Sequence, residues 1–206
     1  MDFCKEYLGL ITGEFKGINL TRILDYEEFK LKQYRDSIYP FSEIDLIQNI
    51  FKKFDNIVDV GFGGGFPILP LAELFPHKNF YGFEARLKKV NVVSEIAERM
   101  NIKNVKLNHI RIENIAFDKS VLITIKAVGK IEDLLKKIYP VSDVTVCFFK
   151  GPEVEHLENT NIKNWDLVCK ESYNLDKSTN RTIYIYKNKA VLRGTPDHDF
   201  EYFSNI

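Results

Sequence analysis

Apolar and polar positions divide the chain into a helical first part and a longer stretch in which strands alternate with helices. Over roughly the first fifty residues the apolar positions recur at helical spacing. Ser42 followed by Asp45 predicts a capped helix start. The apolar stripe of that helix consists of Ile44, Ile47, Phe51 and Phe54. Residues 1–54 are therefore expected to form a helical extension packed on the rest of the molecule.

Beyond residue 54, short β-branched or apolar runs alternate with amphipathic segments. Strands that would pair side by side are predicted at Ile57–Val60, Asn79–Phe83, Val105–Leu107, Val121–Ile125 and Val144–Phe149. Helices are predicted between them at Ile68–Phe75, 86–100 and 130–138. A terminal hairpin is predicted from the alternating runs Trp165–Lys170 and Thr182–Tyr186, which flank the polar residues 176–180.

This order of elements predicts an α/β protein with a Rossmann-like, mostly parallel, twisted sheet and an antiparallel C-terminal hairpin. A chain of 206 residues suits one such domain, expected at 55–190, with a C-terminal tail at 191–206. In doubly wound sheets the ligand binds at the carboxyl ends of the central strands. The search for chemistry therefore starts where the strand Ile57–Val60 ends.

That strand runs into a glycine-rich turn with the pattern Asp59-x-Gly61-x-Gly63-x-Gly65. Glycine permits positive φ and lets the backbone approach a ligand closely, and the helix that follows offers free N–H donors. Such loops hold nucleotide-like cofactors. A dinucleotide fingerprint would need glycine where Phe66 stands, and no Gly-Lys-Ser or Gly-Lys-Thr of a phosphate-binding loop follows.

Glu84 closes the next strand and adds a second acid to the site. A carboxylate at that position can accept hydrogen bonds from both ribose hydroxyls of an adenosine. Together with the glycine pattern, Glu84 indicates S-adenosylmethionine as the cofactor. The alternative is a bare strand-turn-helix with a solvated Glu84.

Composition narrows the choice of partners and compartment. The chain is 45% hydrophobic and 28% charged with a formal net charge of zero, so any nucleic acid must bind to a local patch. No apolar run of membrane-spanning length and no signal-peptide pattern is present, and we expect a cytoplasmic protein. Neither the three cysteines nor the four histidines have ligand spacing, so no metal is expected; they are Cys4, Cys147, Cys169, His77, His109, His156 and His198.

Several short blocks resemble the RsmG (GidB) methyltransferases, which methylate N7 of a guanine in 16S ribosomal RNA. In family order and near family spacing these blocks are Asn19-Leu20-Thr21, Asp36-Ser37, the loop from Asp59 to Pro67, Glu84 with Lys88-Lys89, Arg111-Ile112-Glu113, Ala127, Lys150-Gly151 and Asn180-Arg181. The resemblance covers about residues 15–190. It implies a class I methyltransferase that uses S-adenosylmethionine and acts on 16S rRNA or the small ribosomal subunit; we also expect a monomer.

The resemblance also implies roles for individual residues. Gly61 and Phe66 would contact the methionine and sulfonium part of the cofactor, Glu84 the ribose, and Ile112 with Glu113 the adenine. Lys126 stands where the family has an arginine. Further departures are Gln33 and Thr182 in place of histidines and Ile68 in place of a glycine.

Chemistry at guanine N7 needs no general base, because this atom has an exposed lone pair and carries no proton. Lys126 and Lys150 follow or end buried strands, so each is a candidate catalytic group that would steady a phosphate or the guanine O6 edge. The alternative is a lysine whose stem lies on apolar surface while its amine stays in water. For RNA docking, residues 86–106 carry six basic against two acidic side chains, although a solvated helix face would look the same.

Three other functions stay open on these residues. A nicotinamide oxidoreductase is disfavoured by Phe66. A degenerate methyltransferase fold that only binds RNA or ribosomes is suggested by Lys126, Gln33 and the neutral net charge. A methyltransferase with a different substrate is the third, and the absence of an Asn/Asp-Pro-Pro-Tyr motif disfavours amino methylation of adenine or glutamine.

Overall fold

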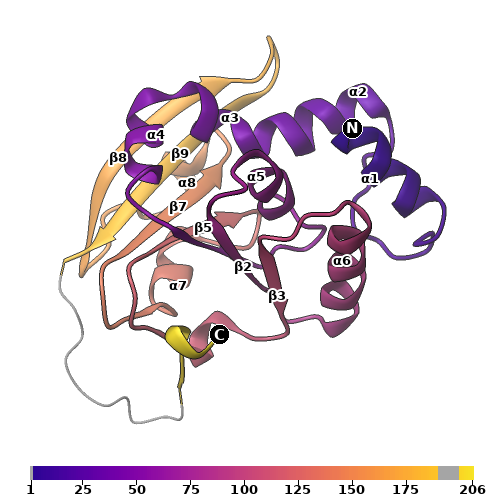
Figure 1. Ribbon diagram of the computed structural model, residues 1–206. Coiled ribbons are helices and arrows are strands. Elements are labelled where there is room, and N and C mark those ends of the chain that lie inside the picture. Colours follow the sequence, from indigo (N-terminus) through magenta and orange to yellow (C-terminus); the bar gives the residue numbers. More distant parts are fainter. Residues whose placement is uncertain (1, 190–199) are drawn as a thin grey trace.

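The computed structural model describes residues 2–189 and 200–206, and its centre within these residues is a seven-stranded sheet (Figure 1). The strand order is β3-β2-β1-β5-β7-β9-β8, and the first five of these strands are parallel. β9 runs antiparallel between β7 and β8. The strands are β1 (Asn56–Val60), β2 (Asn79–Phe83), β3 (Val105–Asn108), β5 (Val121–Lys126), β7 (Val144–Lys150), β8 (Trp165–Asn174) and β9 (Asn180–Asn188).

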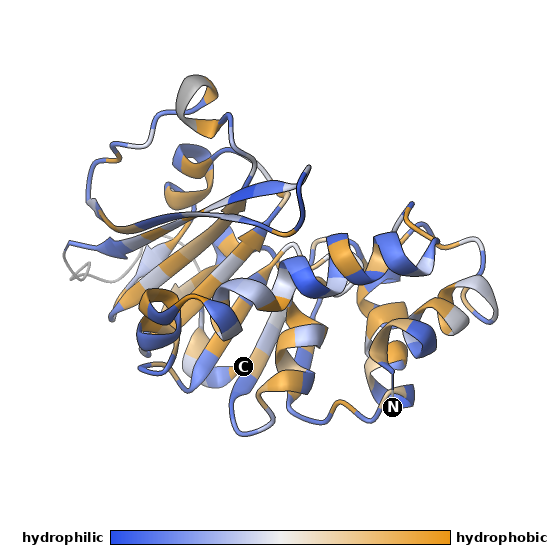
Figure 2. Ribbon diagram, turned by 90° about the horizontal axis from the view of Figure 1, so that it is seen from above, coloured by the Kyte–Doolittle hydropathy of each residue, from blue (hydrophilic) through white to orange (hydrophobic). Residues whose placement is uncertain are grey.

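Helices cover both faces of this sheet. One hydrophobic core joins a sheet face to the N-terminal helices α1 (Phe3–Thr12), α2 (Tyr26–Phe29), α3 (Asp36–Glu43) and α4 (Asp45–Phe51), to α5 (Ile68–Leu74) and to α6 (Leu87–Arg99). A π-helical stretch, Lys30–Arg35, connects α2 to α3. The second core lies under α7 (Ile131–Leu135) and α8 (Val154–Leu157). Apolar residues concentrate along the central strands in Figure 2, as expected for strands buried on both faces.

These observations confirm the predicted α/β fold, with its mostly parallel sheet and antiparallel C-terminal hairpin. The helix predicted at 86–100 spans Leu87–Arg99, and its apolar residues Val90, Val93 and Ala97 are buried. The hairpin strands are longer than predicted. β8 continues to Asn174, where Tyr173 is buried between the exposed polar residues Ser172 and Asn174, and β9 continues to Asn188.

The predicted cap at Ser42 is wrong. Ser42 lies inside α3, and its hydroxyl donates to the carbonyl of Ile38 at 3.2 Å. α4 begins after Ile44 without a side-chain cap. Gln48 instead holds the junction, because its side-chain amide donates to the carbonyl of Ser42 at 2.7 Å.

A small second sheet, which the sequence pattern does not predict, has the order β10-β4-β6. Its strands are β4 (Ile115–Phe117), β6 (Tyr139–Pro140) and β10 (Glu201–Tyr202). Short 3-10 helices precede and follow it at Ile112–Asn114 and Phe203–Asn205. Phe203 is buried, and its ring packs against those of Tyr81 and Phe117. Of the expected tail, residues 191–199 lie outside the described part of the chain, whereas the final residues pack on the main core.

No helix in the described part of the chain combines the length and the apolar character that crossing a membrane would require.

Candidate active site

The glycine-rich turn between β1 and α5 has the backbone conformation that its composition predicts. Gly61, Gly63 and Gly65 have φ values of 69°, 54° and 85°, which L-residues with side chains rarely adopt. A Cβ on Gly61 would lie 2.8 Å from the side chain of Val128. A Cβ on Gly65 would lie 2.8 Å from Leu69. The turn therefore needs glycine both for its conformation and for the space around it.

Glu84 stands at the carboxyl end of β2 and faces this turn. One carboxylate oxygen accepts from the backbone N–H of Gly63 at 3.1 Å, and the other accepts from the N–H of Arg86 at 3.0 Å. The residue is only 9% exposed. Two backbone donors thus fix the carboxylate with lone pairs to spare for a ligand.

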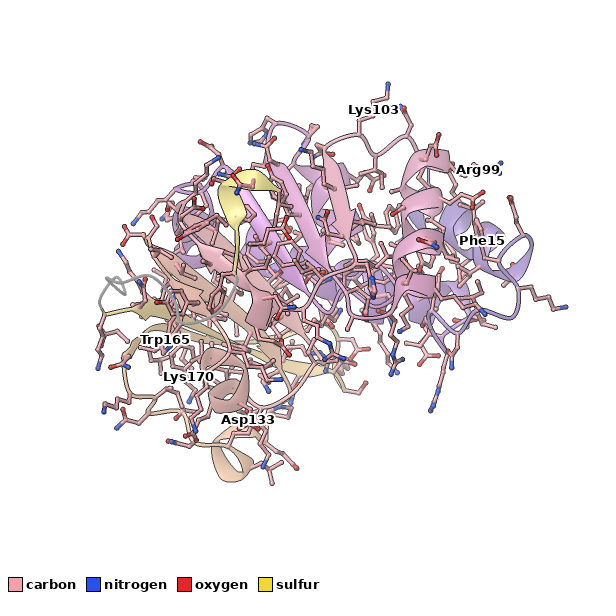
Figure 3. All side chains as sticks on the ribbon, turned by 90° about the horizontal axis from the view of Figure 1, so that it is seen from below. Phe15, Arg99, Lys103, Asp133, Trp165 and Lys170 are labelled. Atoms are coloured by element: carbon pink, nitrogen blue, oxygen red, sulfur yellow. The ribbon has the colours of Figure 1, made fainter. Side chains whose placement is uncertain are left out.

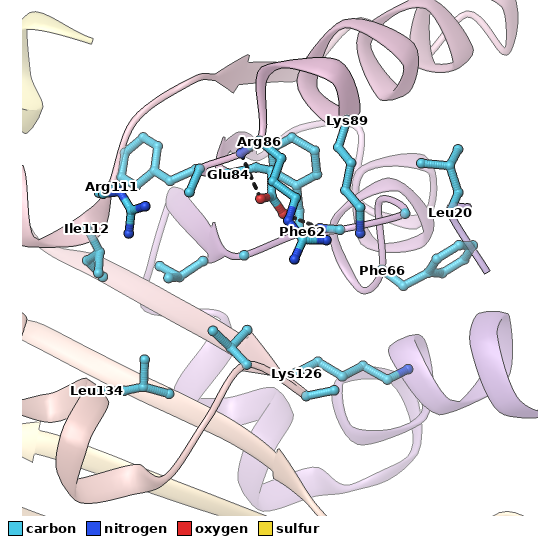
Figure 4. Close-up of a pocket in the computed structure, with 18 of the residues that line it drawn as sticks. Leu20, Phe62, Phe66, Glu84, Arg86, Lys89, Arg111, Ile112, Lys126 and Leu134 are labelled. Carbon is cyan, nitrogen blue, oxygen red and sulfur yellow. Dashed lines mark hydrogen bonds between the residues drawn. The ribbon is translucent and has the colours of Figure 1, made fainter. Parts of the chain in front are cut away.

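The turn and Glu84 form one wall of a cavity of about 640 Å³ (Figure 4). This volume lies in the range of small-molecule and cofactor sites. Lys126, at the end of β5, lies on the wall opposite Glu84. The predicted site residues that line this cavity are Gly61, Gly63, Phe66, Glu84, Ile112, Glu113 and Lys126.

Gly65 and Lys150, which were also predicted as site residues, do not line this cavity. Gly65 is buried under Leu69 and Val93 and shapes the turn from behind. Lys150 ends β7 and lines a neighbouring cavity of about 530 Å³. The two cavities share Lys126 and three other residues, Asp36, Ala127 and Arg181.

An aromatic cluster fastens the N-terminal helices to the glycine turn. Phe66 makes edge contacts with the rings of Phe3, Tyr7 and Phe29, at centroid distances of 6.2, 5.1 and 5.4 Å. The buried hydroxyl of Tyr7 donates to the carbonyl of Gly64 at 2.6 Å. The bulky ring at position 66 therefore fills the space between the turn and α1, which explains why glycine is not needed there.

Sequence reasoning assigned no role to Asp36 or Arg181, although both lie in the blocks that resemble the family. Asp36 is buried, with 1% exposure, and lies on α3. Its carboxylate accepts from Lys126 at 2.9 Å, from Arg181 Nε at 3.1 Å and from the hydroxyl of Tyr173 at 3.4 Å. Burial lowers the pKa of Lys126, while the charge of Asp36 acts in the opposite direction. One carboxylate thus joins α3 to three strands beside the cavity.

The amine of Lys150 is hydrogen-bonded to neighbouring residues of the protein. Its amine donates to the carbonyl of Gly129 at 2.6 Å and to both carboxylate oxygens of Glu158, at 2.9 and 3.1 Å. Glu158 also accepts from the backbone N–H of Ile131 at 2.8 Å. Lys150 and Glu158 together hold the loop between β5 and α7, which forms the rim of both cavities.

Asp59 lies beneath the turn and does not line either of these cavities. It is 1% exposed, and one carboxylate oxygen accepts from the hydroxyl of Thr124 at 3.0 Å. The other oxygen has no partner at hydrogen-bonding geometry among the described residues. Burial raises the pKa of Asp59 to about 7, although the hydrogen bond from Thr124 and the charge of Lys126 oppose this shift.

The basic residues between 86 and 106 do not form one continuous face. Arg86 and Lys89 line the cavity, whereas Arg99 pairs with Glu14 and Glu95. In Figure 3 Arg99 and Lys103 lie together at the far end of α6. Only part of the predicted RNA patch therefore borders the site.

Among the described residues no group of His, Cys, Asp or Glu has an arrangement suited to a metal ion. All three cysteines are free and buried, and burial raises their pKa values. His109 lies 3.0 Å from the carbonyl of Ala85, and His77 packs on Phe75. The side chain of His156 and all of His198 lie outside the described part of the chain.

Comparison with solved structures identifies proteins of similar fold. A crystal structure of a mutant of MtNAS superposes with a TM-score of 0.54 and 11% identity, covering 90% of this chain and 71% of that one. The bifunctional kinase-methyltransferase WbdD gives a TM-score of 0.50 and 15% identity, covering 86% of this chain and 45% of that one. At these identities the likeness concerns the fold alone, an α/β fold with a Rossmann-like, mostly parallel sheet.

Sequence comparison identifies the family. The GidB family, described as rRNA small subunit methyltransferase G, matches residues 2–184. A protein of Mycoplasma mobile named ribosomal RNA small subunit methyltransferase G is 30% identical over 192 residues, which cover 91% of this chain and 83% of that protein. A protein of the same name from Malacoplasma penetrans is 33% identical over 196 residues, covering 89% and 81%. This chain belongs to the GidB family of methyltransferases, which confirms the resemblance seen in the sequence.

Proposed function

We propose that this protein transfers a methyl group from S-adenosylmethionine to N7 of a guanine in 16S rRNA. The observation that carries the proposal is the cavity bounded by the glycine turn and Glu84, in a chain whose family is that of rRNA small subunit methyltransferase G. Family and fold call for a methyl donor. The polar groups that face the cavity suit S-adenosylmethionine in particular.

The cavity of about 640 Å³ beside the glycine turn, called the donor cavity below, has lining residues that suit each part of that cofactor. Glu84 would hold the ribose hydroxyls, and the apolar side chain of Ile112 beside Glu113 would receive the adenine. Gly61, Gly63 and Phe66 would border the methionine part. When bound, S-adenosylmethionine supplies an electrophilic methyl group. The residues of this chain have to orient it and exclude water.

Lys126 is placed to contact the acceptor base. An ammonium group has three donors, and those of Lys126 reach Asp36 at 2.9 Å and Ser37 Oγ at 3.4 Å, which leaves one for a ligand. An acceptor such as guanine O6 suits that donor. Asp36 offsets part of the positive charge that Lys126 and Arg181 would present to a sulfonium. The neighbouring cavity, which Lys126 also lines, is where we place the guanine.

Lys150 acts on the acceptor side as a positioning residue. Its donors are occupied by Gly129 and Glu158, so its effect on the base is indirect, through the loop that it holds. No general base is required, since N7 carries a lone pair and no proton. Positioning is then the main source of acceleration, with a ceiling of about 7–11 kcal/mol.

The test is transfer of labelled methyl groups to small-subunit RNA that lacks the modification, followed by mapping of the labelled base. We expect label in one guanine of 16S rRNA, at N7. Label at another atom or in another RNA would contradict the assignment of the acceptor. Binding of S-adenosylhomocysteine without any transfer would favour the degenerate RNA-binding alternative, which the family match does not favour.

A further inference from the structure

Seven cationic side chains line the donor cavity, and four of them form an ion pair with a carboxylate. The seven are Lys32, Arg86, Lys89, Arg111, Lys126, Lys137 and Arg181. Four are paired within the described residues: Lys32 with Glu28 at 2.7 Å, Arg111 with Glu113 at 3.8 Å, and both Lys126 and Arg181 with Asp36 at 2.9 and 3.1 Å. The other three, Arg86, Lys89 and Lys137, have no ion pair with any described residue.

Of these three, Lys89 alone is partly buried, whereas Arg86 and Lys137 are exposed. Lys89 extends from the first turn of α6 toward the glycine turn (Figure 4). Its Nζ lies 3.7 Å from the position that a Cβ on Gly63 would take. No hydrogen bond or ion pair joins it to any described residue. A partly buried cation without a protein partner favours the binding of an anionic ligand group.

Gly63 lies between Lys89 and Glu84. The backbone N–H of Gly63 donates to Glu84 at 3.1 Å, and the α-carbon of the same residue faces the amine of Lys89. If Glu84 holds the ribose, the part of the cofactor that continues along the turn toward Phe66 is the amino-acid end. That end carries the one anionic group of S-adenosylmethionine, its carboxylate.

We propose that Lys89 binds the carboxylate of the methyl donor. This inference rests on the proposed function, because it assumes S-adenosylmethionine in the cavity. It moves Lys89 from the RNA-docking patch, where the sequence placed it, to the cofactor site. Lys88, one residue earlier, is exposed and does not line the cavity, so it offers a matched control on the same helix.

The test compares S-adenosylmethionine with its decarboxylated derivative, which differs only by the missing carboxylate, by calorimetric titration of the whole chain. The wild-type protein should bind S-adenosylmethionine roughly 10- to 100-fold more tightly, as for loss of a charge-assisted hydrogen bond. In Lys89→Met the affinity for S-adenosylmethionine should fall by that factor while the affinity for the decarboxylated compound stays unchanged. Lys89→Arg should restore most of the difference, and Lys88→Met should behave as wild type.

Equal weakening of both compounds by Lys89→Met would overturn the assignment, because it would show that Lys89 only supports the turn. Unchanged binding of S-adenosylmethionine in that variant would overturn it as well. A wild-type protein that binds neither compound would overturn the proposed function itself, and the two failures are thereby distinguished.

Discussion

At the scale of single residues, Glu84 and Lys150 separate cofactor binding from acceptor positioning. Glu84 faces the donor cavity, whereas Lys150 supports the rim of the neighbouring one. Glu84→Ala should weaken binding of S-adenosylhomocysteine roughly 100-fold, since charge-assisted hydrogen bonds contribute about 1.5–3 kcal/mol each. Lys150→Ala should leave that affinity unchanged and lower turnover on RNA, with partial rescue by Lys150→Arg.

Calorimetric titration and single-turnover methyl transfer measure the two effects. Glu98→Ala, which removes an exposed acid from α6 away from the cavity, serves as the control for Glu84. Unchanged cofactor affinity in Glu84→Ala would refute the placement of the ribose. Loss of cofactor binding in Lys150→Ala would refute the division of roles.

Asp59 predicts a dependence of stability on pH. Its pKa is raised from 3.8 to about 7 in the folded protein, mainly by burial. Between these values the unfolded chain has lost the proton that the folded chain keeps, so the free energy of unfolding falls as pH rises. Above about pH 7 Asp59 is ionised in both states, and the free energy of unfolding no longer changes with its titration. A shift of about 3 units corresponds to at most about 4 kcal/mol.

The variant Asp59→Asn removes this ionisation and can still accept from Thr124. Its free energy of unfolding relative to wild type should increase between pH 4.5 and 7.5, as measured by urea titration at both ends of that range. If the free energies of unfolding of the two proteins differ by the same amount at both pH values, Asp59 does not titrate in that range.

At the scale of elements, α1 supports the glycine turn through one buried hydrogen bond. Tyr7→Phe keeps the ring in the aromatic cluster but leaves the carbonyl of Gly64 without the hydroxyl of Tyr7. We expect a loss of about 1–2 kcal/mol of stability, as for a buried polar group left unsatisfied. Weaker binding of S-adenosylhomocysteine should accompany it.

Chemical denaturation of Tyr7→Phe, with Tyr26→Phe beside it, makes the measurement. Tyr26 also gives up a hydrogen bond, to Asp2, but this bond is exposed and its removal should change little. Equal effects of the two variants would mean that the bond to Gly64 has no special importance for the turn.

The elements themselves were predicted with uneven success, for a local reason in each case. The strand at Asn56–Val60 and the turn after it follow from β-branched residues and glycines next to each other in sequence. The cap at Ser42 failed because the helix of Asp36–Glu43 extends through this residue and its hydroxyl finds a carbonyl within that helix. Strands of two or three residues in the small sheet carry no periodicity that a sequence pattern could reveal.

At the scale of the whole molecule, Asp36 couples the N-terminal helices to the sheet. Removal of one partner from a buried ion pair typically costs about 3–5 kcal/mol, because the remaining charge stays buried. Asp36→Ala should destabilise by about that amount. Adding Lys126→Met to that variant should restore part of the loss, since it removes the stranded charge, while Arg181 is partly exposed and can be hydrated.

Two probes follow this unfolding. The fluorescence of the single tryptophan, Trp165 on β8, reports on the sheet, and far-ultraviolet circular dichroism reports mainly on the helices. We expect coincident transitions, since residues 1–54 and the sheet share one core and one ion-pair network. Separate transitions would show that the helical extension is an independent unit. A double variant less stable than Asp36→Ala would contradict the stranded-charge explanation.

The sequence by itself determined the succession of the main-sheet strands and the helices between them, the glycine turn and the acid that closes the next strand. These features depend on the periodicity, backbone conformation and spacing of residues that are near one another in the chain. The tertiary structure decided which charges are paired: Asp36 pairs with both Lys126 and Arg181, Glu158 pairs with Lys150, and Lys89 faces the cavity with no ion pair among the described residues. Ion pairing depends on distances of a few ångströms between side chains far apart in sequence, and only the folded chain sets those distances.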